Sequence, residues 1–217
     1  MKVEKVKKIC AICGKENFYN QVVSFSNQGK SDFDLREPQS LLSDGSLIQE
    51  CPECHYCSYD ISKLVEQSYY YEMYKKEKWI NNFESIFKNE SNNAVRKYLI
   101  MAKQFHNNSQ FLDEFKMLIG ASWACEDDKE KSNKLKNEAI DLYFKEILKN
   151  RRTQLMQLSD LARQVEKFDI AKDLITASSL LTNENDKDYE FIKKVIDYES
   201  KFILNKDSKR HNLSEIK

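Results

Sequence analysis

The chain has 217 residues, of which 32% are charged and 12% aromatic, and its formal net charge at pH 7 is zero. With only 4 glycines and 2 prolines it lacks the turn residues of a β-sandwich, so long amphipathic helices should dominate. Residues 1–60 hold seven Lys/Arg and nine Asp/Glu, a net charge of −2, which argues against an N-terminal unit built to grip nucleic-acid phosphates.

The first eight residues alternate Val with Lys and Glu and lack the apolar segment that a signal peptide requires. The longest apolar run, 117–125, is far too short to cross a bilayer. We therefore expect a soluble, cytoplasmic protein with no membrane association. In a reducing compartment, clustered cysteines indicate metal binding or catalysis rather than disulfides.

Short signals from Cys10 to Asp60 predict a small β-rich unit. Val22, Val23 and Phe25 form a β-like run, turn-prone residues follow it, and both prolines lie in this part. From Ile61 the apolar spacing becomes helical, and no proline interrupts the remaining chain. The sequence thus predicts a unit at 1–60, a helical domain at 61–205 and a frayed polar tail at 206–217.

Seven apolar stripes with three- and four-residue spacing predict seven helices in the second part. One representative residue from each stripe, in chain order, is Phe83, Tyr98, Phe115, Leu142, Leu161, Leu174 and Val195.

The segment 158–181 resembles a tetratricopeptide hairpin. Small residues at Ala162 and Ala171 flank an aromatic at Phe168, a spacing that lets two antiparallel helices approach closely. Lys167 stands where the turn glycine of that repeat is usual. The predicted fold class is mainly α: a small β-rich zinc ribbon followed by tetratricopeptide-like helical hairpins, with a generic helical bundle as the alternative.

Two C-x-x-C motifs carry the strongest chemical signal. They are formed by Cys10 and Cys13 and, after a 37-residue insert, by Cys51 and Cys54. Two such turns can place four thiolates in a tetrahedron around one ion. We therefore predict one structural Zn²⁺ per chain, held by these four residues. A small unit with few large apolar side chains needs such a contribution to its folding free energy.

Cys57 extends the second motif to C-x-x-C-x-x-C, which resembles an iron–sulfur ligand string. The ferredoxin pattern would continue with a Cys near position 61 followed by Pro, but the chain has Ile61 and Ser62. A closed four-thiolate site leaves no open position for catalysis. Replacement of Cys54 by Cys57 as a ligand, or participation of His55, stays open. Gly14 and His55 occupy matching places that favour a left-handed backbone.

The chain resembles a bacterial family of uncharacterised proteins catalogued as domain of unknown function 2225, in which two cysteine motifs and an Asp/Arg-containing insert precede tetratricopeptide-like helices. The matching residues are Cys10, Cys13, Gly14, the run 31–36, Cys51, Pro52, Cys54 and Tyr56. His55 replaces the family glycine, and Cys57 stands where a small residue is expected. The resemblance implies this architecture and a zinc ion, and it implies no activity.

Two further segments suggest alternative functions. The aromatic–basic stretch 69–79 can stack bases and hold phosphates, although the simpler interpretation is that its tyrosines pack the ribbon onto the first helix and leave its lysines solvated. Asp32, Asp34, Arg36 and Glu37 can form a polar catalytic site, although acidic clusters more often stabilise turns. Cys125 shares a face with apolar side chains and is expected to be a small buried residue.

We therefore expect a non-enzymatic adaptor whose helical hairpins bind an unknown protein or peptide, with nucleic-acid binding or catalysis at the insert as alternatives. The oligomeric state is left open. The binding surface is expected between Tyr98 and Phe202. Its candidate exposed residues are Lys103, Gln104, Arg163, Gln164 and Lys167.

Overall fold

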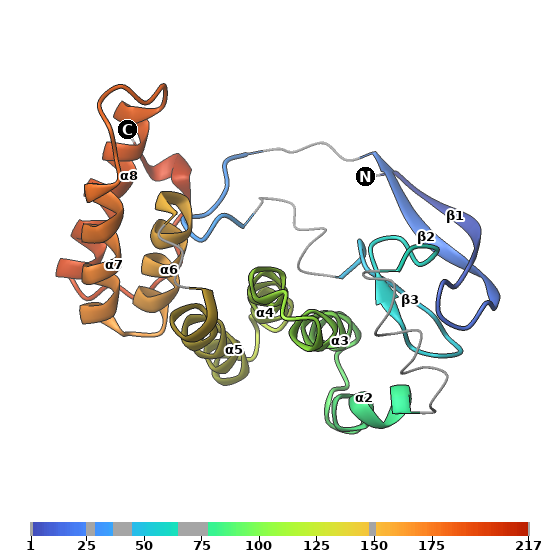
Figure 1. Ribbon diagram of the computed structural model, residues 1–217. Coiled ribbons are helices and arrows are strands. Elements are labelled where there is room, and N and C mark those ends of the chain that lie inside the picture. Colours follow the sequence, from blue (N-terminus) through green and yellow to red (C-terminus); the bar gives the residue numbers. More distant parts are fainter. Residues whose placement is uncertain (1, 25–28, 37–44, 65–77, 148–150, 217) are drawn as a thin grey trace. The chain divides into compact units, whose positions relative to one another are not determined.

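The computed structural model describes residues 2–24, 29–36, 45–64, 78–147 and 151–216, with the side chains of 78–82 left out. Within these ranges the chain forms seven α-helices and two small antiparallel sheets of two strands each (Figure 1). The expected class, mainly α with a small β-rich N-terminal part, is confirmed.

The first sheet is a hairpin of β1 (Lys2–Ile9) and β2 (Glu16–Ser24), in which Lys5 lies opposite Asn20 and Ile9 opposite Glu16. The sequence indicated a strand near Val22 but not β1. The apolar residues of β1 lie at positions 3, 6 and 9, a spacing of three that does not match the two-residue period of a strand. Pairing with β2, rather than its own pattern, holds β1 extended.

The second sheet pairs β3 (Gln49–Glu50) with β4 (Cys57–Ser58), and Glu50 lies opposite Cys57. Each pair of strands therefore closes on one C-x-x-C motif. We call Cys10–Lys15 the first cysteine turn and Cys51–Tyr56 the second cysteine turn.

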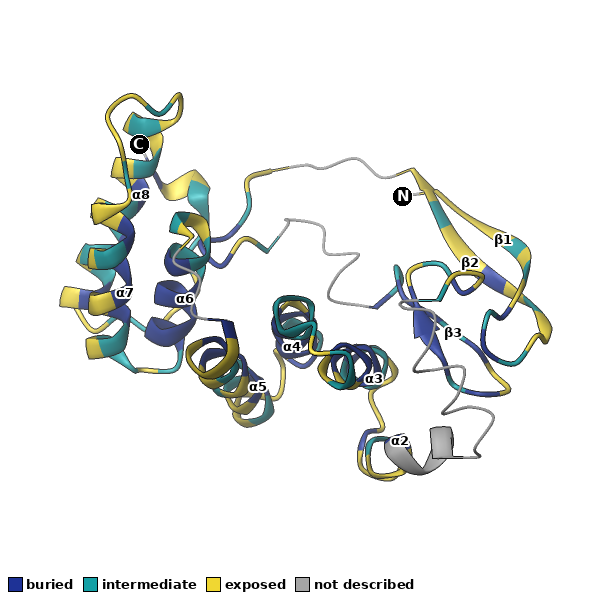
Figure 2. Ribbon diagram, viewed as in Figure 1, coloured by how far each residue is buried: buried dark blue, intermediate teal, exposed yellow. Residues whose placement is uncertain are grey.

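The helices coincide with the seven predicted stripes, and α3 to α8 each bury one face (Figure 2). Their bounds are α2 (Lys78–Asn89), α3 (Asn93–Asn107), α4 (Phe111–Ala124), α5 (Lys129–Leu142), α6 (Arg152–Gln164), α7 (Phe168–Leu180) and α8 (Tyr189–Leu204). A π-helical turn, Tyr143–Ile147, extends α5.

Three of these helices end in the same way without a glycine. Ser109, Glu166 and Lys206 follow α3, α6 and α8 with φ of 56°, 64° and 51°. In each case the next amide donates to a carbonyl five residues earlier, for example from Lys167 to Ala162 at 2.8 Å. This is the hydrogen bond of the Schellman motif, which satisfies a carbonyl left open at the helix end. The α6–α7 turn therefore forms although Glu166, not Gly, takes the left-handed position.

Small residues let the helical hairpins pack closely. A Cβ on Gly120 of α4 would lie 2.5 Å from Cε1 of Tyr98 on α3, so only glycine fits against that ring. In the α6–α7 hairpin, Ala162 and Ala171 are fully buried, as the sequence predicted, and Ser159 Oγ donates to Ala171 O at 2.9 Å.

The chain divides into two compact units. Unit 1 comprises Met1–Ser26 and Leu41–Leu135, and unit 2 comprises Asn27–Ser40 and Lys136–Lys217. This division differs from the predicted boundary near residue 60, because β4, which follows the second cysteine turn, is hydrogen-bonded to α3 and belongs with it. The segment 29–36 belongs with the distant α6, where Gln157 Nε2 donates to Asp34 O at 2.8 Å.

The predicted fraying of residues 206–217 is wrong for the described positions up to 216. Leu213–Glu215 forms a 3₁₀ turn, Asn212 pairs with Asp32 in an isolated β-bridge, and Ile216 is buried. Composition missed this order because the contacts join residues about 180 positions apart. Across the described helices, none has both the length and the apolar character needed to span a bilayer.

Candidate metal centre

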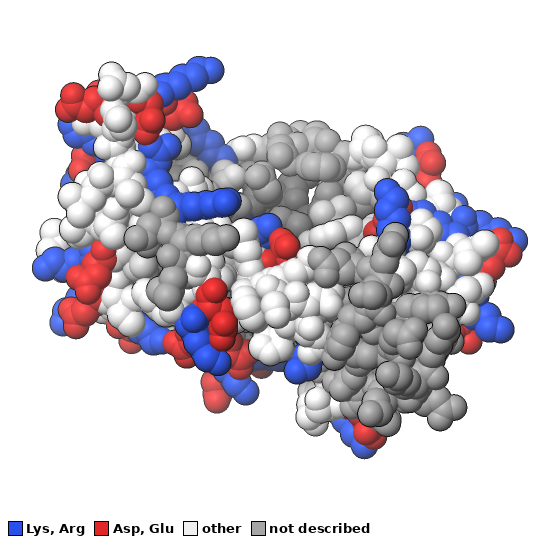
Figure 3. Space-filling model, in the orientation of Figure 1, with Lys and Arg blue, Asp and Glu red and all other residues white. Residues whose placement is uncertain are grey.

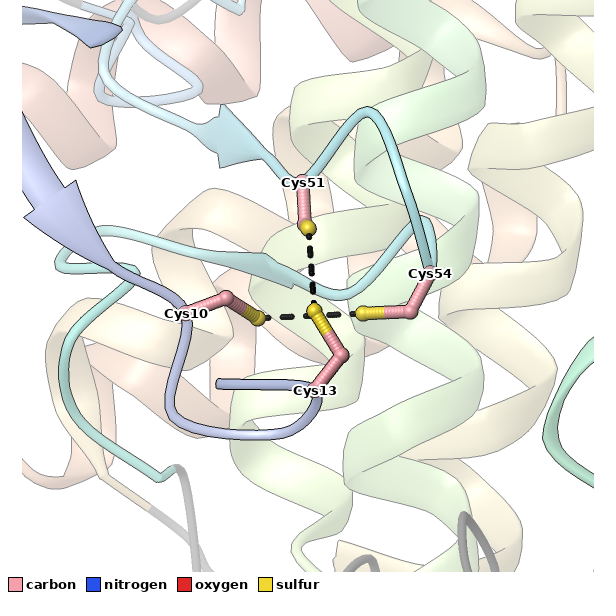
Figure 4. A group of neighbouring side chains, drawn as sticks. All are labelled: Cys10, Cys13, Cys51 and Cys54. Carbon is pink, nitrogen blue, oxygen red and sulfur yellow. Dashed lines mark hydrogen bonds between the residues drawn. The ribbon is translucent and has the colours of Figure 1, made fainter. Parts of the chain in front are cut away.

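Four cysteine sulfurs meet between the two cysteine turns (Figure 4). The Sγ atoms of Cys10, Cys13, Cys51 and Cys54 all lie within 4.8 Å of one another. Across the turns, Sγ of Cys10 is 3.7 Å from that of Cys54, and Sγ of Cys13 is 3.6 Å from that of Cys51. The structure thus brings together the four residues that the sequence selected, a set that can hold a metal ion.

The two turns have the same backbone design. The amide of Gly14 donates to Cys10 O, and the amide of His55 donates to Cys51 O, both at 2.9 Å. Gly14 and His55 have φ of 69° and 58°, so both occupy the predicted left-handed position. A tight turn of this kind points the first and fourth residues of C-x-x-C to the same side, which is why the spacing is diagnostic.

The proton distribution among the thiols shows how closely the sulfurs interact. The hydrogen bond from Cys54 lowers the pKa of Cys10 to about 5, and the same contact raises the pKa of Cys54. Burial raises the pKa of Cys13 to about 11. Four thiolates at these separations repel one another, so all four ionise together only around a cation.

Cys57 and His55 lie outside the group of four. Cys57 is fully buried, and its Sγ contacts His55 O at 3.6 Å. The imidazole of His55 turns to Glu50, with 2.9 Å between Nδ1 and Oε1. The alternatives in which Cys57 replaces Cys54 or His55 joins the ligands therefore find no support in the arrangement.

Polar side chains that the sequence did not single out connect the second cysteine turn to the helices of unit 1. Nη2 of Arg96 on α3 donates to Oε2 of Glu50 at 2.9 Å, and Oε1 of Glu50 contacts Nδ1 of His55. The His55 ring also packs on Phe87 of α2, with 4.4 Å between centroids. Glu50 thus joins the turn to the helical part. No local motif identifies such a pair, since its members are 46 positions apart in sequence.

Gln104 of α3 holds the strand that follows the turn. Its Nε2 donates to Cys57 O at 2.9 Å, and its Oε1 accepts the amide of Cys57 at 3.3 Å. A side-chain amide here replaces a neighbouring strand, so both backbone groups of a buried residue are satisfied.

Gln104 was among the five side chains expected to be exposed on a binding surface, and this expectation is wrong for three of them. Gln104 and Arg163 are fully buried, and Gln164 is 6% exposed. Each of the three side chains forms a hydrogen bond with a polar partner in its own unit. The spacing of apolar residues along a helix does not predict such pairs. Lys103 is exposed and Lys167 half-buried.

A cleft of about 480 Å³ adjoins the second cysteine turn and is lined in part by Pro52, His55, Arg96 and Lys97. Nε of Arg96 is buried there with no hydrogen-bond partner among the described residues. The cleft lies within unit 1 and is polar, so it offers hydrogen-bonding groups rather than an apolar pocket.

The acidic insert forms a turn within unit 2. The amide of Leu35 donates to the carbonyl oxygen of Asp32 at 3.0 Å. The amide of Arg36 donates to Asp34 Oδ1 at 3.2 Å. Asp32 pairs with Arg210 at 3.0 Å. The insert therefore behaves as the turn-stabilising cluster that the sequence favoured over a catalytic site.

Other predicted features are placed as follows. Cys125 is buried, and its thiol donates to Ala121 O at 3.3 Å, as expected for a small core residue. Glu37, the stretch 69–77 and the side chains of 78–79 lie outside the described residues.

Comparisons of the chain with protein-family models, with curated proteins and with solved structures find no match. The case for function therefore depends on the four-cysteine group and on the helices.

Proposed function

We propose that this chain is a non-enzymatic adaptor, in which one structural Zn²⁺ fixes the cysteine turns and tetratricopeptide-like hairpins bind a protein partner. The four-cysteine group carries the first part of this proposal. Two matched turns present four sulfurs within 4.8 Å of one another, and no other group of potential metal ligands occurs in the described part of the chain.

Distances favour a single ion over an iron–sulfur cluster. With Zn–S bonds of about 2.3 Å, the sulfurs of a tetrahedral site are about 3.8 Å apart. The contacts of 3.6 and 3.7 Å between the two turns are close to this value. A multi-iron cluster spreads its thiolates around several metal atoms and needs a wider opening. Because all four ligands would come from the protein, the zinc would contribute folding free energy rather than catalysis.

The adaptor role is supported by the helical hairpins. Small residues bring α3 against α4 and α6 against α7, the packing that stacked helical repeats use. At the end of unit 2 where α7 leads into α8, Leu180, Leu181 and Phe191 are 83%, 45% and 45% exposed. Exposed large apolar side chains on a surface with charges of both signs (Figure 3) are typical of protein-contact sites.

Metal analysis tests the zinc proposal. We expect one zinc per purified chain, lost in Cys10→Ser and in Cys51→Ser. Cys57→Ala and Cys125→Ala are matched controls, since both residues are buried cysteines outside the group of four, and both should keep the metal. Iron with visible charge-transfer absorption would rule out the proposal, and so would equal metal loss in a control.

Affinity capture from the native host tests the adaptor role. A captured partner should be retained by the unaltered chain and lost by Leu180→Glu/Phe191→Glu, while the melting temperature stays within about 2 °C because surface changes cost little. Lys172→Glu, an exposed change elsewhere on α7, is the control. Equal capture by both variants would remove this end of unit 2 from the proposed contact.

A further inference from the structure

Segment 207–216 lies on unit 2 like a bound peptide. Arg163 of α6 donates from Nη1 to the carbonyl oxygens of Asp207 and, at 2.7 Å, Lys209. The amide of Leu213 donates to Ser31 O at 2.9 Å, and the amide of Phe33 donates to His211 O at 3.2 Å. Most of these contacts use backbone groups of segment 207–216, the mode by which proteins recognise extended peptides of varied sequence.

Two apolar side chains, three positions apart, anchor the segment. Ile216 is 8% exposed and packs with Phe33 of the insert and Val195 of α8, and Leu213 borders the same cluster. The ring of His211 stacks on Phe202 with 3.7 Å between centroids and 4° between planes. The rest of the segment is exposed or half-buried. Its side chains therefore contribute one stacked ring, a pair of apolar residues, and polar contacts from Asn212 and Arg210 to segment 29–36.

The Arg163 guanidinium depends on segment 207–216 for two of its hydrogen bonds. Its Nε and Nη2 are engaged by Glu199 and Asp160, so Nη1 relies on the two carbonyl oxygens of the segment. The whole Arg163 side chain is fully buried. If segment 207–216 left, Nη1 would need water or the carbonyl groups of another chain, since a buried guanidinium without acceptors is costly.

We propose that the groove formed by α6, α8 and segment 29–36 is a peptide-docking site whose ligand is an extended protein segment with apolar residues at positions i and i+3, and that segment 207–216 occupies it as an internal competitor. The inference rests on the proposed adaptor role and gives it a second surface besides the exposed Leu180, Leu181 and Phe191. Arg163 clamps the ligand backbone, and the cluster around Phe33 and Val195 receives its apolar side chains.

The test uses the full chain and a fluorescent peptide spanning residues 205–217. In Asn212→Ala/Ile216→Ala the internal segment loses one of its two apolar anchors and its hydrogen bonds to Lys30 O and Asp32 Oδ1, whereas the groove is unchanged. The peptide should bind this variant at least about tenfold more tightly than the unaltered chain, because a tethered competitor acts at an effective concentration near the millimolar range. A peptide with both Leu213→Ala and Ile216→Ala is the control and should not bind.

Hydrogen exchange of the unaltered chain provides the second readout. The amides of Leu213 and Ile216 should exchange at least about tenfold faster than those of α6 and α8, because the segment opens without unfolding of unit 2. No peptide binding to a folded double variant would overturn the inference. Unfolding of that variant, or exchange of the segment only together with α6 and α8, would overturn it too, since the segment would then be core. Such a failure leaves the adaptor proposal standing if capture still depends on Leu180 and Phe191.

Discussion

Around the cysteine turns of unit 1, the fully buried side chains are mainly those of cysteines, Tyr56 and Ile61, whereas α6 and α7 of unit 2 bury leucines and alanines along a continuous stripe. In unit 1, polar contacts from α3 hold the strands that flank the second cysteine turn. The two turns bring together four thiols, which repel one another when they are ionised. The helices of unit 2 enclose an apolar core and buried charges that pair with one another. The same chain thus places its four-cysteine group, which can hold a metal ion, where apolar burial is scarce.

The largest expected effect comes from removing the metal. Structural zinc in small units supplies roughly 10–16 kcal/mol of apparent binding free energy, so a strong chelator should unfold the cysteine turns. Hydrogen exchange should then become fast in 2–24 and 45–64 and stay unchanged in α6–α8. Because Gln104 and Arg96 of α3 bond to the strands that flank the second cysteine turn, we also expect partial loss of protection in α3. Uniform loss over both units would contradict the comparison.

The next largest effect tests the charges inside unit 2. Arg163→Met leaves Asp160 and Glu199 buried without their cation, which should lower the free energy of unfolding by about 3–5 kcal/mol. Lys167→Met is the matched control on a half-buried lysine, whose ion pair with Asp141 spans 3.8 Å, and should cost less than about 1 kcal/mol. Denaturant unfolding followed by circular dichroism measures both. Similar losses of unfolding free energy in the two variants would show that Arg163 does not stabilise unit 2 by neutralising Asp160 and Glu199.

A smaller effect is expected from the polar link in unit 1. Gln104→Ala leaves the amide and carbonyl of Cys57 buried without partners, and we expect a cost of about 2–4 kcal/mol. Lys103→Ala, at the exposed neighbouring position, should change stability by less than about 0.5 kcal/mol. Zinc content after mild dialysis gives a second measurement, since loosening of Cys57 should also weaken the adjacent turn. Equal stability of the two variants would argue against the link.

The smallest effect concerns pH. Burial, followed by the nearby Asp160 charge, raises the pKa of Glu199 to about 8, above its ordinary value of 4.5. A raised pKa in the folded state means that this contribution to stability is complete below pH 4.5 and is lost as the pH rises through 8. Unit 2 should therefore become less stable between about pH 4.5 and 8, and Glu199→Gln should flatten that dependence. Asp160, whose pKa burial raises to about 6, acts in the same direction at lower pH. An unchanged slope in Glu199→Gln would refute the assignment.

Much of the local structure could be predicted because it depends on neighbours in sequence. The two-residue gap between Cys10 and Cys13, repeated after Cys51, defines a turn by itself, and the left-handed roles of Gly14 and His55 follow from it. The helical stripes are equally local. Their periods place all seven helices, although they do not tell which polar residue inside a stripe finds a buried partner.

The errors share a physical cause. Arg163 and Gln104 look like surface residues because burial of a polar side chain is costly unless a distant residue compensates it, and Glu199 and Cys57 are 36 and 47 positions away. The order of segment 207–216 and the placement of 29–36 with α6 likewise depend on long-range pairs. The cysteine group was predictable because one ion demands one known set of ligands, whereas peptide-like packing has no such fixed code.

Zinc K-edge X-ray absorption of the purified 217-residue chain tests the central claim most directly. The account predicts one zinc ion surrounded by four sulfur atoms at about 2.3 Å. A first shell that contains nitrogen or oxygen would place a residue other than Cys10, Cys13, Cys51 and Cys54 on the metal, and the absence of zinc from protein purified without chelator would contradict the account.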